Sequence, residues 1–223
     1  MRTPYGHDDD HSAELARLRA AIEAAGDLVY EWNLSDDRLA WLGDAGRVFA
    51  PPRKGPPTTG DELASCVHPD DVRRRQKALS DHLKRGLPYD VEYRVRTEDG
   101  CFHWVHDRGA VDASHGGAVL RLSGTLRLVT DRKEREARLE YLANFDELTG
   151  HYNKARLRDD LEKAIAEALR TGEGGAFLVF GIDQLAMINS AYGYQAGDRV
   201  LCELGSRLDE CLRASDTIGR ISG

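Results

Sequence analysis

The sequence predicts an α+β protein in which an antiparallel sheet with helices is followed by a helical linker and the first part of an α/β domain. Two observations support this prediction. Residues 89–129 contain three successive segments in which apolar and polar side chains alternate, joined by short turns. Residues 153–213 instead place one continuously apolar run between two amphipathic helical segments.

The composition is that of an ordinary folded protein and excludes several classes of function. Of 223 residues, 41% are hydrophobic and 31% are charged, and the formal net charge is -7. This acidic balance disfavours nucleic acid as a partner, because phosphate binding depends on an excess of Lys and Arg. The four dispersed cysteines form no CxxC pair and are typical of reduced thiols. With no signal-peptide pattern and no bilayer-length apolar stretch, we expect a cytoplasmic protein that does not contact a membrane.

The first domain is predicted over residues 13–130, after a solvated tail at 1–12. A helix over 13–25 ends at Gly26 and carries an apolar face that consists of Leu15, Leu18, Ile22 and Ala25. This face is larger than one domain needs to cover, which predicts a homodimer.

Further elements of this domain follow from turn and cap signals. Residues 28–33 and 38–42 are predicted to form a hairpin around the turn LSDD. A helix over 67–86 is predicted to begin with Asp70 as its N-cap and to end at Gly86.

Three strands complete the predicted sheet, and each alternates with period two. The side chains that share a face are Tyr89, Val91, Tyr93 and Val95 in the first strand, Phe102, Trp104 and His106 in the second, and Leu120, Leu122, Leu126 and Leu128 in the third.

The character of the sequence changes after residue 130. Residues 131–145 are charged and predict a helical linker, and residues 146–223 form the second domain. A helix over 153–175 is predicted to begin with Asn153 as its N-cap. The run AFLVFGI at 176–182 predicts a strand buried on both faces, and another helix follows over 198–213.

The first domain resembles the PAS sensor domains. The residues that support the resemblance are His68, Pro69, Asp70 and Asp71 at a helix start, Tyr93, Arg94, Asp99 and Gly100 in a hairpin, and Trp104 in the next strand. Such domains usually end with Asp-Ile-Thr, whose Asp couples the sheet to the outgoing helix. Here Leu128, Val129 and Thr130 stand in those places, so the coupling differs from the family pattern or uses Asp131.

No motif identifies a ligand for the PAS-like domain. His103 or His106 could ligate haem, and an aromatic pocket could hold a flavin or metabolite. The two histidines, however, are three residues apart on a strand and point to opposite faces, so they do not form a two-histidine metal site. We favour core roles for Trp32, Trp41, Phe102 and Trp104. Without a ligand, the domain would serve in dimerisation or in docking of a protein partner.

Residues 140–223 resemble the first half of a GGDEF domain, the diguanylate cyclase family that joins two GTP molecules into cyclic di-GMP. FDELTGHYNKARL at 145–157 resembles the entry motif, with His151 and Lys154 in place of the usual Leu and Arg. GIDQLAMINSAYGYQAGDRVL at 181–201 resembles the central motif, and RASDTIGRISG leads to the signature itself, where SG stands for the usual GG.

The resemblance implies that the catalytic centre is degenerate. The first metal-binding Asp of the family maps to Gly181, which offers a hard cation only a carbonyl. The usual Lys, Asp and His map to Ala186, Ser190 and Tyr194. Asp183 matches the second acid of the motif and need not replace the first. We therefore predict no cyclase activity, no catalytic residue and no metal ligand in this chain.

Two pairs of residues keep the family pattern for binding nucleotides. Asn189 and Asp198 map to the guanine-reading positions, and an Asn/Asp pair can complement the acceptor and donor edges of guanine. The alternative is that Asn189 is a turn residue and Asp198 a helix N-cap. Arg213 and Asp216 satisfy the R-x-x-D pattern of the product-inhibition site, whose ligand is cyclic di-GMP. Alternatively, Arg213 complements a helix dipole.

Three functions remain open from the sequence. The first is a cyclic di-GMP signalling regulator in which a PAS-like input acts on a degenerate GGDEF-like domain that binds GTP or cyclic di-GMP and controls a downstream domain, such as an EAL phosphodiesterase. The second is a full-length protein that is an active cyclase. The third is a non-enzymatic docking adaptor.

Overall fold

The computed structural model describes residues 14, 17, 20–22, 24–49, 55–96, 100–112, 121–213 and 215–222. The chain divides into two compact units, Met1–Lys133 and Glu134–Gly223. The predicted tail at 1–12 lies outside the described residues, as do Leu15 and Leu18 of the predicted helix 13–25. The described positions of that helix from Glu14 to Ala25 are helical. Among the described residues, no helix is long and apolar enough to cross a membrane.

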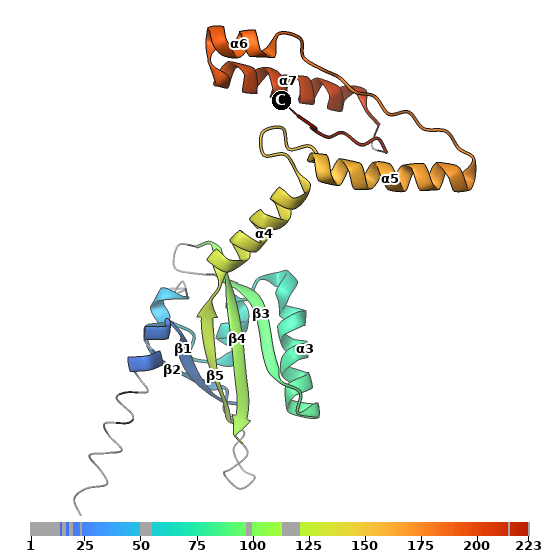
Figure 1. The fold of residues 1–223 in the computed structure, drawn as a ribbon. Coiled ribbons are helices and arrows are strands. Elements are labelled where there is room, and N and C mark those ends of the chain that lie inside the picture. The colour runs from blue at the N-terminus through green and yellow to red at the C-terminus, as the bar shows by residue number, and fades with distance from the viewer. Residues whose placement is uncertain are drawn as a thin grey trace, which may run out of the picture. The chain divides into compact units, whose positions relative to one another are not determined.

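A five-stranded antiparallel sheet forms the first unit (Figure 1). Its strands are β1 (Leu28–Asn33), β2 (Arg38–Leu42), β3 (Tyr89–Arg96), β4 (Phe102–Asp112) and β5 (Arg121–Leu128). Their order across the sheet is β2-β1-β5-β4-β3, so β2 and β3 are the edge strands. Between β2 and β3 the chain forms η1 (Ala45–Arg47), α2 (Gly60–Cys66) and α3 (Pro69–Arg85). The predicted antiparallel sheet with helices is confirmed.

The core lies between the sheet and these helices. Its fully buried side chains include Tyr93, Val95, Val105, Leu122 and Leu126 from the strands, and Phe49 and Leu63 from the intervening segment. Val72, Ala78 and Leu79 of α3 pack against them. The buried face predicted for β3 is confirmed, because Tyr89, Val91, Tyr93 and Val95 are all buried.

The buried face of β4 is the one opposite to the aromatic face noted in the sequence. Val105 and Asp107 are completely buried, whereas Phe102, Trp104 and His106 are only partly covered. Leu128 of β5 is 43% exposed, although it shares a face with the buried Leu126. The core contact of that face therefore ends before the last residue of the strand.

A polar cluster occupies the centre of this core. The carboxylate of Asp107 accepts hydrogen bonds from the hydroxyl groups of Tyr30 (2.8 Å), Tyr89 (2.8 Å) and Tyr93 (2.7 Å). Arg75 of α3 is 5% exposed, and its guanidinium lies over the rings of Trp32 and Tyr93. Burial raises the pKa of Asp107, and the positive charge of Arg75 and the three hydroxyl groups oppose this shift.

Glycine makes room for this cluster in the sheet. A Cβ at Gly124 of β5 would lie 2.5 Å from the ring of Tyr30 and 2.5 Å from the carbonyl oxygen of Arg108. No side chain fits so close to a neighbouring backbone. Gly124 thus lets the Tyr30 ring cross the sheet surface and reach Asp107.

The ends of α3 differ in part from the prediction. His68, not Asp70, is the N-cap residue, and its Nδ1 accepts a hydrogen bond from the backbone N–H of Asp70 (3.2 Å). Pro69 occupies the first helical position, where it loses no hydrogen bond. The predicted end at Gly86 is confirmed, because this residue has φ +67°.

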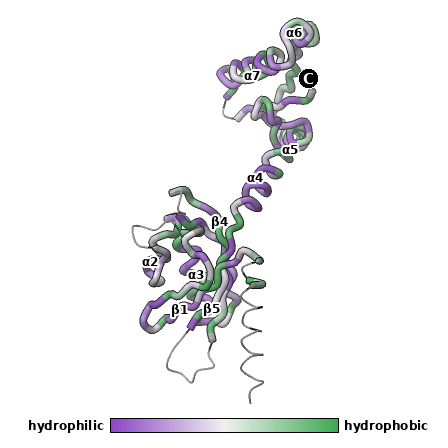
Figure 2. Tube along the Cα trace, turned by 90° about the vertical axis from the view of Figure 1, so that its left-hand side faces the viewer, coloured by the Kyte–Doolittle hydropathy of each residue, from purple (hydrophilic) through white to green (hydrophobic). Residues whose placement is uncertain are grey.

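In its described residues, the second unit contains three helices and part of a fourth. The helix α4 (Thr130–Asn144) begins in the first unit and is mostly hydrophilic (Figure 2). It is followed by α5 (Lys154–Thr171), α6 (Leu185–Tyr192) and α7 (Tyr194–Cys211). The predicted N-cap of α5 is confirmed, because Asn153 accepts a hydrogen bond from the backbone N–H of Arg156 (2.9 Å).

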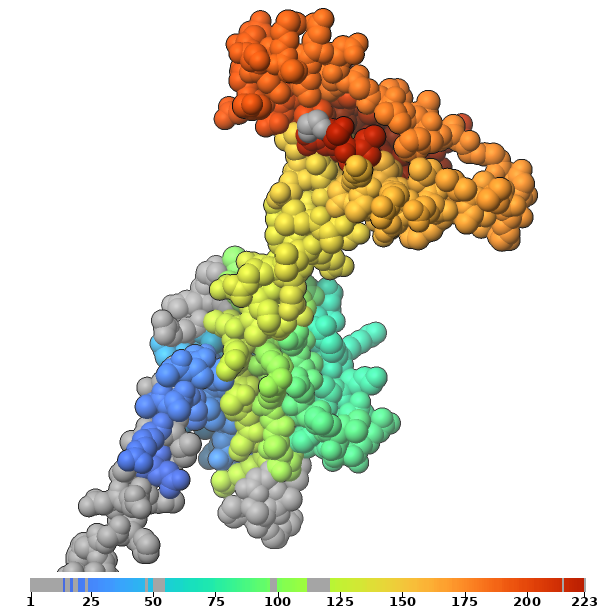
Figure 3. All heavy atoms as spheres, in the orientation of Figure 1, coloured from blue at the N-terminus to red at the C-terminus, as the bar shows by residue number. Residues whose placement is uncertain are grey.

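The buried strand predicted at 176–182 is wrong. These residues have no regular secondary structure, and the side chains from Phe177 to Phe180 are between 54% and 69% exposed. They lie on the surface of the unit, in orange in the space-filling view (Figure 3). A strand needs a neighbour that satisfies its backbone groups. None of the described residues pairs with this segment.

Candidate functional site

The motif at 181–198 folds into a helical hairpin of α6 and α7. Gln184, with φ +59°, precedes α6, and Gly193, with φ +83°, is the one residue between the two helices. Because that backbone conformation favours glycine, Gly193 allows the chain to reverse in a single residue. Asn189 therefore lies inside α6 and is not a turn residue. Asp198 lies in the second turn of α7, so it is not the helix N-cap either.

Asn189 packs directly against α7 at the residue before Asp198. A Cβ at Gly197 would lie 2.0 Å from Oδ1 of Asn189, so a larger residue fits there only if the amide moves. This Oδ1 atom is buried and has no hydrogen-bond partner among the described residues. The side chain of Asp198 is exposed. The fold thus places the buried, unsatisfied amide oxygen of Asn189 against Gly197. The exposed carboxylate of Asp198 is on the next residue of the chain.

Gly181 lies in the irregular segment before this hairpin and is exposed. A Cβ at this position would meet no atom within 4 Å, and the residue has no positive φ. Packing therefore does not require glycine at this position. Asp183 is also exposed, and the described residues contain no group of three or more His, Cys, Asp or Glu arranged to hold a metal ion.

The entry loop before α5 is tied to the last described residues. Asp146 accepts hydrogen bonds from the backbone N–H and the hydroxyl group of Thr149 (both 2.9 Å) and from Nη1 of Arg220 (3.1 Å). Burial raises the pKa of Asp146, but these hydrogen bonds outweigh it, and the net pKa is lowered. The backbone N–H of Arg220 also donates to the carbonyl of Tyr152 (2.8 Å).

His151, one of the substituted residues, has a packing role in the structure. Its ring covers Gly205 of α7, where a Cβ would lie 2.6 Å from Cε1. Its Nε2 atom is 3.1 Å from the carboxylate of Asp209. The sequence did not predict these contacts, because Gly205 and Asp209 are more than fifty residues away along the chain.

Arg213 and Asp216 form a tight turn after α7. The Asp216 carboxylate accepts a hydrogen bond from the backbone N–H of Arg213 (2.9 Å), and the N–H of Asp216 donates to the carbonyl of Arg213 (2.9 Å). The guanidinium of Arg213 is exposed and forms no ion pair with a described residue. The carboxylate therefore holds the turn, and the guanidinium stays available.

In the first unit, the start of α3 is bound to β3 by charged groups. Asp71 accepts hydrogen bonds from Nε (2.8 Å) and Nη2 (3.2 Å) of Arg94 and from Nη2 of Arg74 (3.0 Å). Burial raises the pKa of Asp71, but the hydrogen bonds from Arg94 outweigh it, and the net pKa is lowered. The guanidinium groups of Arg74 and Arg94 lie 5.5 Å and 5.3 Å from the ring centroid of Trp104.

The same tryptophan anchors the beginning of α4. The backbone N–H of Trp104 donates to the hydroxyl oxygen of Thr130 (3.0 Å), and the N–H of Val129 donates to the carbonyl of Trp104 (2.8 Å). Lys133 lies 5.4 Å from the Trp104 ring and pairs with Glu92 (2.6 Å). Among the described residues, Asp131 forms no such contact. The described contacts between the sheet and the start of α4 therefore include Thr130, Arg132, which pairs with Glu92, and Lys133.

With this geometry in place, comparison with known families identifies both units. Residues 52–126 match the family described as PAS fold, and residues 143–223 match the family described as diguanylate cyclase, GGDEF domain. The chain carries a PAS domain followed by a GGDEF domain.

Known proteins are similar to this chain over much of its length. The uncharacterized protein y4lL of Sinorhizobium fredii is 28% identical over 220 residues, which cover 93% of this chain and 26% of that protein. The probable diguanylate cyclase DgcE of Escherichia coli is 28% identical over 142 residues, 64% of this chain and 12% of that protein. The chain therefore spans at most about a quarter of the length of these two relatives.

Two further matches each cover about half of the chain. The bifunctional diguanylate cyclase/cyclic di-GMP phosphodiesterase MucR of Pseudomonas aeruginosa is 38% identical over 96 residues, 43% of this chain and 14% of that protein. The solved structure of a sensory box histidine kinase/response regulator from Burkholderia thailandensis is 32% identical in sequence. The match covers 56% of this chain and 92% of the solved chain, with a TM-score of 0.44.

The histidines considered as ligands in the PAS domain make local contacts instead. Nε2 of His106 lies 2.6 Å from the carboxylate of Asp90, and Nδ1 of His103 lies 3.4 Å from the hydroxyl group of Thr130. The two rings have different partners and do not converge. Trp32 is buried and its Nε1 donates to Asp37 (2.8 Å), which agrees with the predicted core role.

Proposed function

We propose that this chain is a regulatory segment of a cyclic di-GMP signalling protein, in which the PAS domain acts on a GGDEF domain that binds a guanine nucleotide without converting it. The PAS and GGDEF matches support cyclic di-GMP signalling as the broad role. The observation that supports the finer proposal is Gly181, which maps to a metal-ligand position of the family although the space around it is open.

Loss of the carboxylate at 181 removes a metal ligand and its charge. Phosphoryl transfer needs a divalent cation to neutralise the phosphates and to activate the attacking hydroxyl group. Gly181 offers a carbonyl only, and Asp183 is a single exposed acid. Because a carboxylate would fit at 181, the glycine is not a requirement of the fold. We therefore infer that this domain has no cyclase activity.

We assign nucleotide recognition to residues that match the family pattern, namely Asn189, Asp198 and Arg213. The unsatisfied oxygen of Asn189 is an acceptor that lacks a donor, and a buried acceptor in this state costs free energy until a donor reaches it. The N–H groups of guanine are donors of this kind, and Asp198 lies on the neighbouring helix. For cyclic di-GMP, the exposed guanidinium of Arg213 is the proposed contact, because Asp216 already holds the turn.

The proposal also includes the oligomeric state of the protein and the domain that it controls. We propose a cytoplasmic homodimer in which nucleotide occupancy of the GGDEF domain controls a downstream domain, such as an EAL phosphodiesterase. Neither an active cyclase in the full-length protein nor a docking adaptor is needed to explain why Asn189 and Asp198 are retained.

Calorimetric titration with GTP and with cyclic di-GMP tests this proposal. Binding of GTP should be lost in Asn189→Ala and Asp198→Ala and kept in the control Ser190→Ala, whose hydroxyl group only donates to the carbonyl of Ala186. Binding of cyclic di-GMP should be lost in Arg213→Ala. Absence of heat with both nucleotides would favour the adaptor. Synthesis of cyclic di-GMP from GTP and Mg²⁺ by the full-length protein would refute degeneracy.

A further inference from the structure

In the edge strand β3, the backbone groups that face away from the sheet form hydrogen bonds at one end of the strand only. The N–H of Arg94 donates to the carboxylate of Asp71 (3.0 Å), and the carbonyl of Arg94 accepts from the N–H of His68 (2.8 Å). An isolated antiparallel bridge joins Val67 to Val95 at the same place. The segment before α3 therefore pairs with this end of the strand.

The backbone groups of Asp90 and Glu92 point to the same side as those of Arg94. Along a strand, the N–H and C=O groups of residues two apart share one direction, and those of the residues between face the neighbouring strand. Because β4 lies on the other side of β3, the groups of Asp90 and Glu92 face away from the sheet. No described residue satisfies them, so two residues of strand edge are open.

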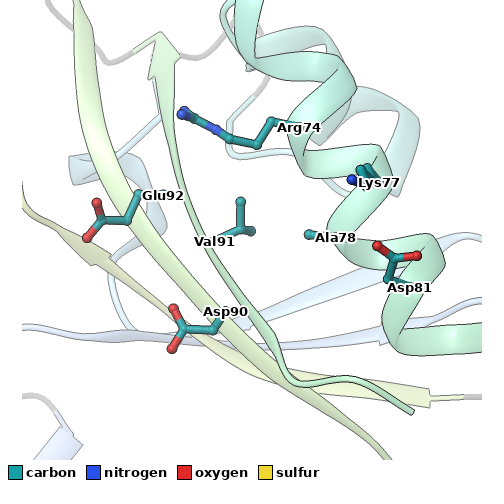
Figure 4. Close-up of a pocket in the computed structure, with 7 residues that line it drawn as sticks. All are labelled: Arg74, Lys77, Ala78, Asp81, Asp90, Val91 and Glu92. Atoms are coloured by element: carbon teal, nitrogen blue, oxygen red, sulfur yellow. The ribbon is translucent and has the colours of Figure 1, made fainter. Parts of the chain in front are cut away.

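The helix α3 forms a second wall beside this open edge. Arg74, Lys77, Ala78 and Asp81 of α3 and Asp90, Val91 and Glu92 of β3 line a groove of about 470 Å³. In Figure 4 the α3 side chains stand on one side, Val91 lies between the walls, and Asp90 and Glu92 turn away from the helix. The groove thus combines an apolar floor, a strand edge and a charged helix face.

Most charges of this groove already have partners. Asp81 pairs with Arg85 (3.2 Å), and Asp90 pairs with Arg108 (3.0 Å). Two more charged residues line the groove and have partners: Glu92 pairs with Lys133, and Arg74 pairs with Asp71. Within the described chain, the exposed ammonium group of Lys77 is the groove charge that forms no ion pair. An occupant of this groove would therefore gain most from a negative charge beside Lys77.

We propose that this groove binds an extended acidic peptide segment of a protein partner, which adds to β3 as a further strand. Two residues of the segment, two positions apart, exchange hydrogen bonds with the backbones of Asp90 and Glu92, and an acidic side chain of the segment meets Lys77. Backbone pairing supplies the affinity, and the charge supplies the preference, as in other cases of strand addition. This surface belongs to the first unit and shares no residue with the proposed nucleotide site.

Hydrogen exchange of the free chain gives the first test. The amides of Asp90 and Glu92 should exchange quickly, whereas those of Val91 and Tyr93, which face β4, should be protected. Equal protection of all four amides would mean that the edge is already paired, and would overturn the proposal.

The second test uses acetyl-Glu-Val-Glu-Val-Glu-amide, titrated into the ¹⁵N-labelled chain and followed by NMR. Shifts should concentrate at Asp90–Glu92 and along α3 from Arg74 to Asp81, and the peptide should slow exchange of the two open amides. A peptide in which all five residues are N-methylated, and which therefore cannot donate backbone hydrogen bonds to the edge from these residues, should bind about fivefold more weakly for each essential hydrogen bond lost. Equal binding of the methylated peptide would overturn strand addition.

Charge variants separate this site from general electrostatic attraction. Lys77→Glu should weaken binding of the peptide, whereas Lys84→Glu, the same change on α3 outside the groove lining, should leave it within about twofold, as expected for a distant, screened charge. A lysine-containing peptide that binds equally well would refute the acidic partner. Shifts at the same residues on raising the chain concentration without peptide would point to a second copy and overturn the proposal.

Discussion

Replacement of Asp107 by alanine is the sharpest test of how the PAS domain is held together. Its carboxylate is completely buried and accepts hydrogen bonds from Tyr30, Tyr89 and Tyr93, at 2.7–2.8 Å. Arg75, also buried, supplies the compensating positive charge. Asp107→Ala would leave three hydroxyl groups without their common acceptor and the buried guanidinium of Arg75 without a nearby negative charge.

The expected loss follows from opposing free energies. Each hydrogen bond to a charged acceptor contributes about 1.5–3 kcal/mol, so three contribute roughly 5–9 kcal/mol. Burying the carboxylate costs several kcal/mol, part of which the mutation recovers, and breaking a buried charge pair typically costs about 3–5 kcal/mol in total. We therefore expect Asp107→Ala to lower the free energy of unfolding by about 4 kcal/mol. Asp107→Asn keeps the shape and should cost less.

Urea unfolding followed by tryptophan fluorescence measures this loss in the PAS domain alone, because Trp32, Trp41 and Trp104 all lie in the first unit. With a slope near 2 kcal/mol per molar, the midpoint should fall by about 2 M urea. The control Asp90→Ala removes an ion pair at the exposed edge and should cost less than about 1 kcal/mol. If Asp107→Ala costs no more than this control, the cluster does not stabilise the fold and the reasoning fails.

Three further predictions address packing, pH and the hairpin. Gly124→Ala should lower the free energy of unfolding by about 1–3 kcal/mol, because its Cβ overlaps a backbone carbonyl, whereas Gly181→Ala should stay within about 0.5 kcal/mol in the same urea titration. The folded pKa of Asp71 lies below its ordinary value of 3.8, so its contribution is present above about pH 4 and is lost as the pH falls through the folded pKa. Asp71→Asn should therefore remove part of the destabilisation that the same urea titration shows below about pH 4. Gly197→Ala should displace Asn189, whose Oδ1 would lie 2.0 Å from the new Cβ, and calorimetry should show weaker GTP binding; unchanged affinity would contradict the assigned site.

Local patterns predicted much of the first domain correctly. The alternation in β3 identified its buried face, and Gly86 identified the end of α3, because both signals act between residues a few positions apart. The predicted N-cap of α3, Asp70, lies two residues after the actual one, His68, because Pro69 occupies the first helical position. The sequence also did not predict that the carboxylate of Asp71 accepts a hydrogen bond from the backbone N–H of Arg94, 23 residues further along the chain.

The run at 176–182 shows the limit of such patterns. Its apolar side chains and β-branched residues resemble a buried strand, but burial depends on a partner that the run does not specify. In the described chain no strand lies beside it, and its side chains are exposed. Hydrophobicity indicates that a segment is suited to burial, and only its neighbours determine whether it is buried.

By itself, the sequence determined the two-part α+β plan and the strand periodicity of the PAS domain, and it predicts that a metal-ligand carboxylate is missing at Gly181. These depend on residue type and short-range spacing. The tertiary structure decided that Asp107 joins tyrosines 14 to 77 residues away, that Asn189 packs on Gly197, and that the Asp90–Glu92 edge stays open beside α3. The physical reason is that strand order and helix packing, which no local spacing specifies, set which distant groups share a buried or an open position.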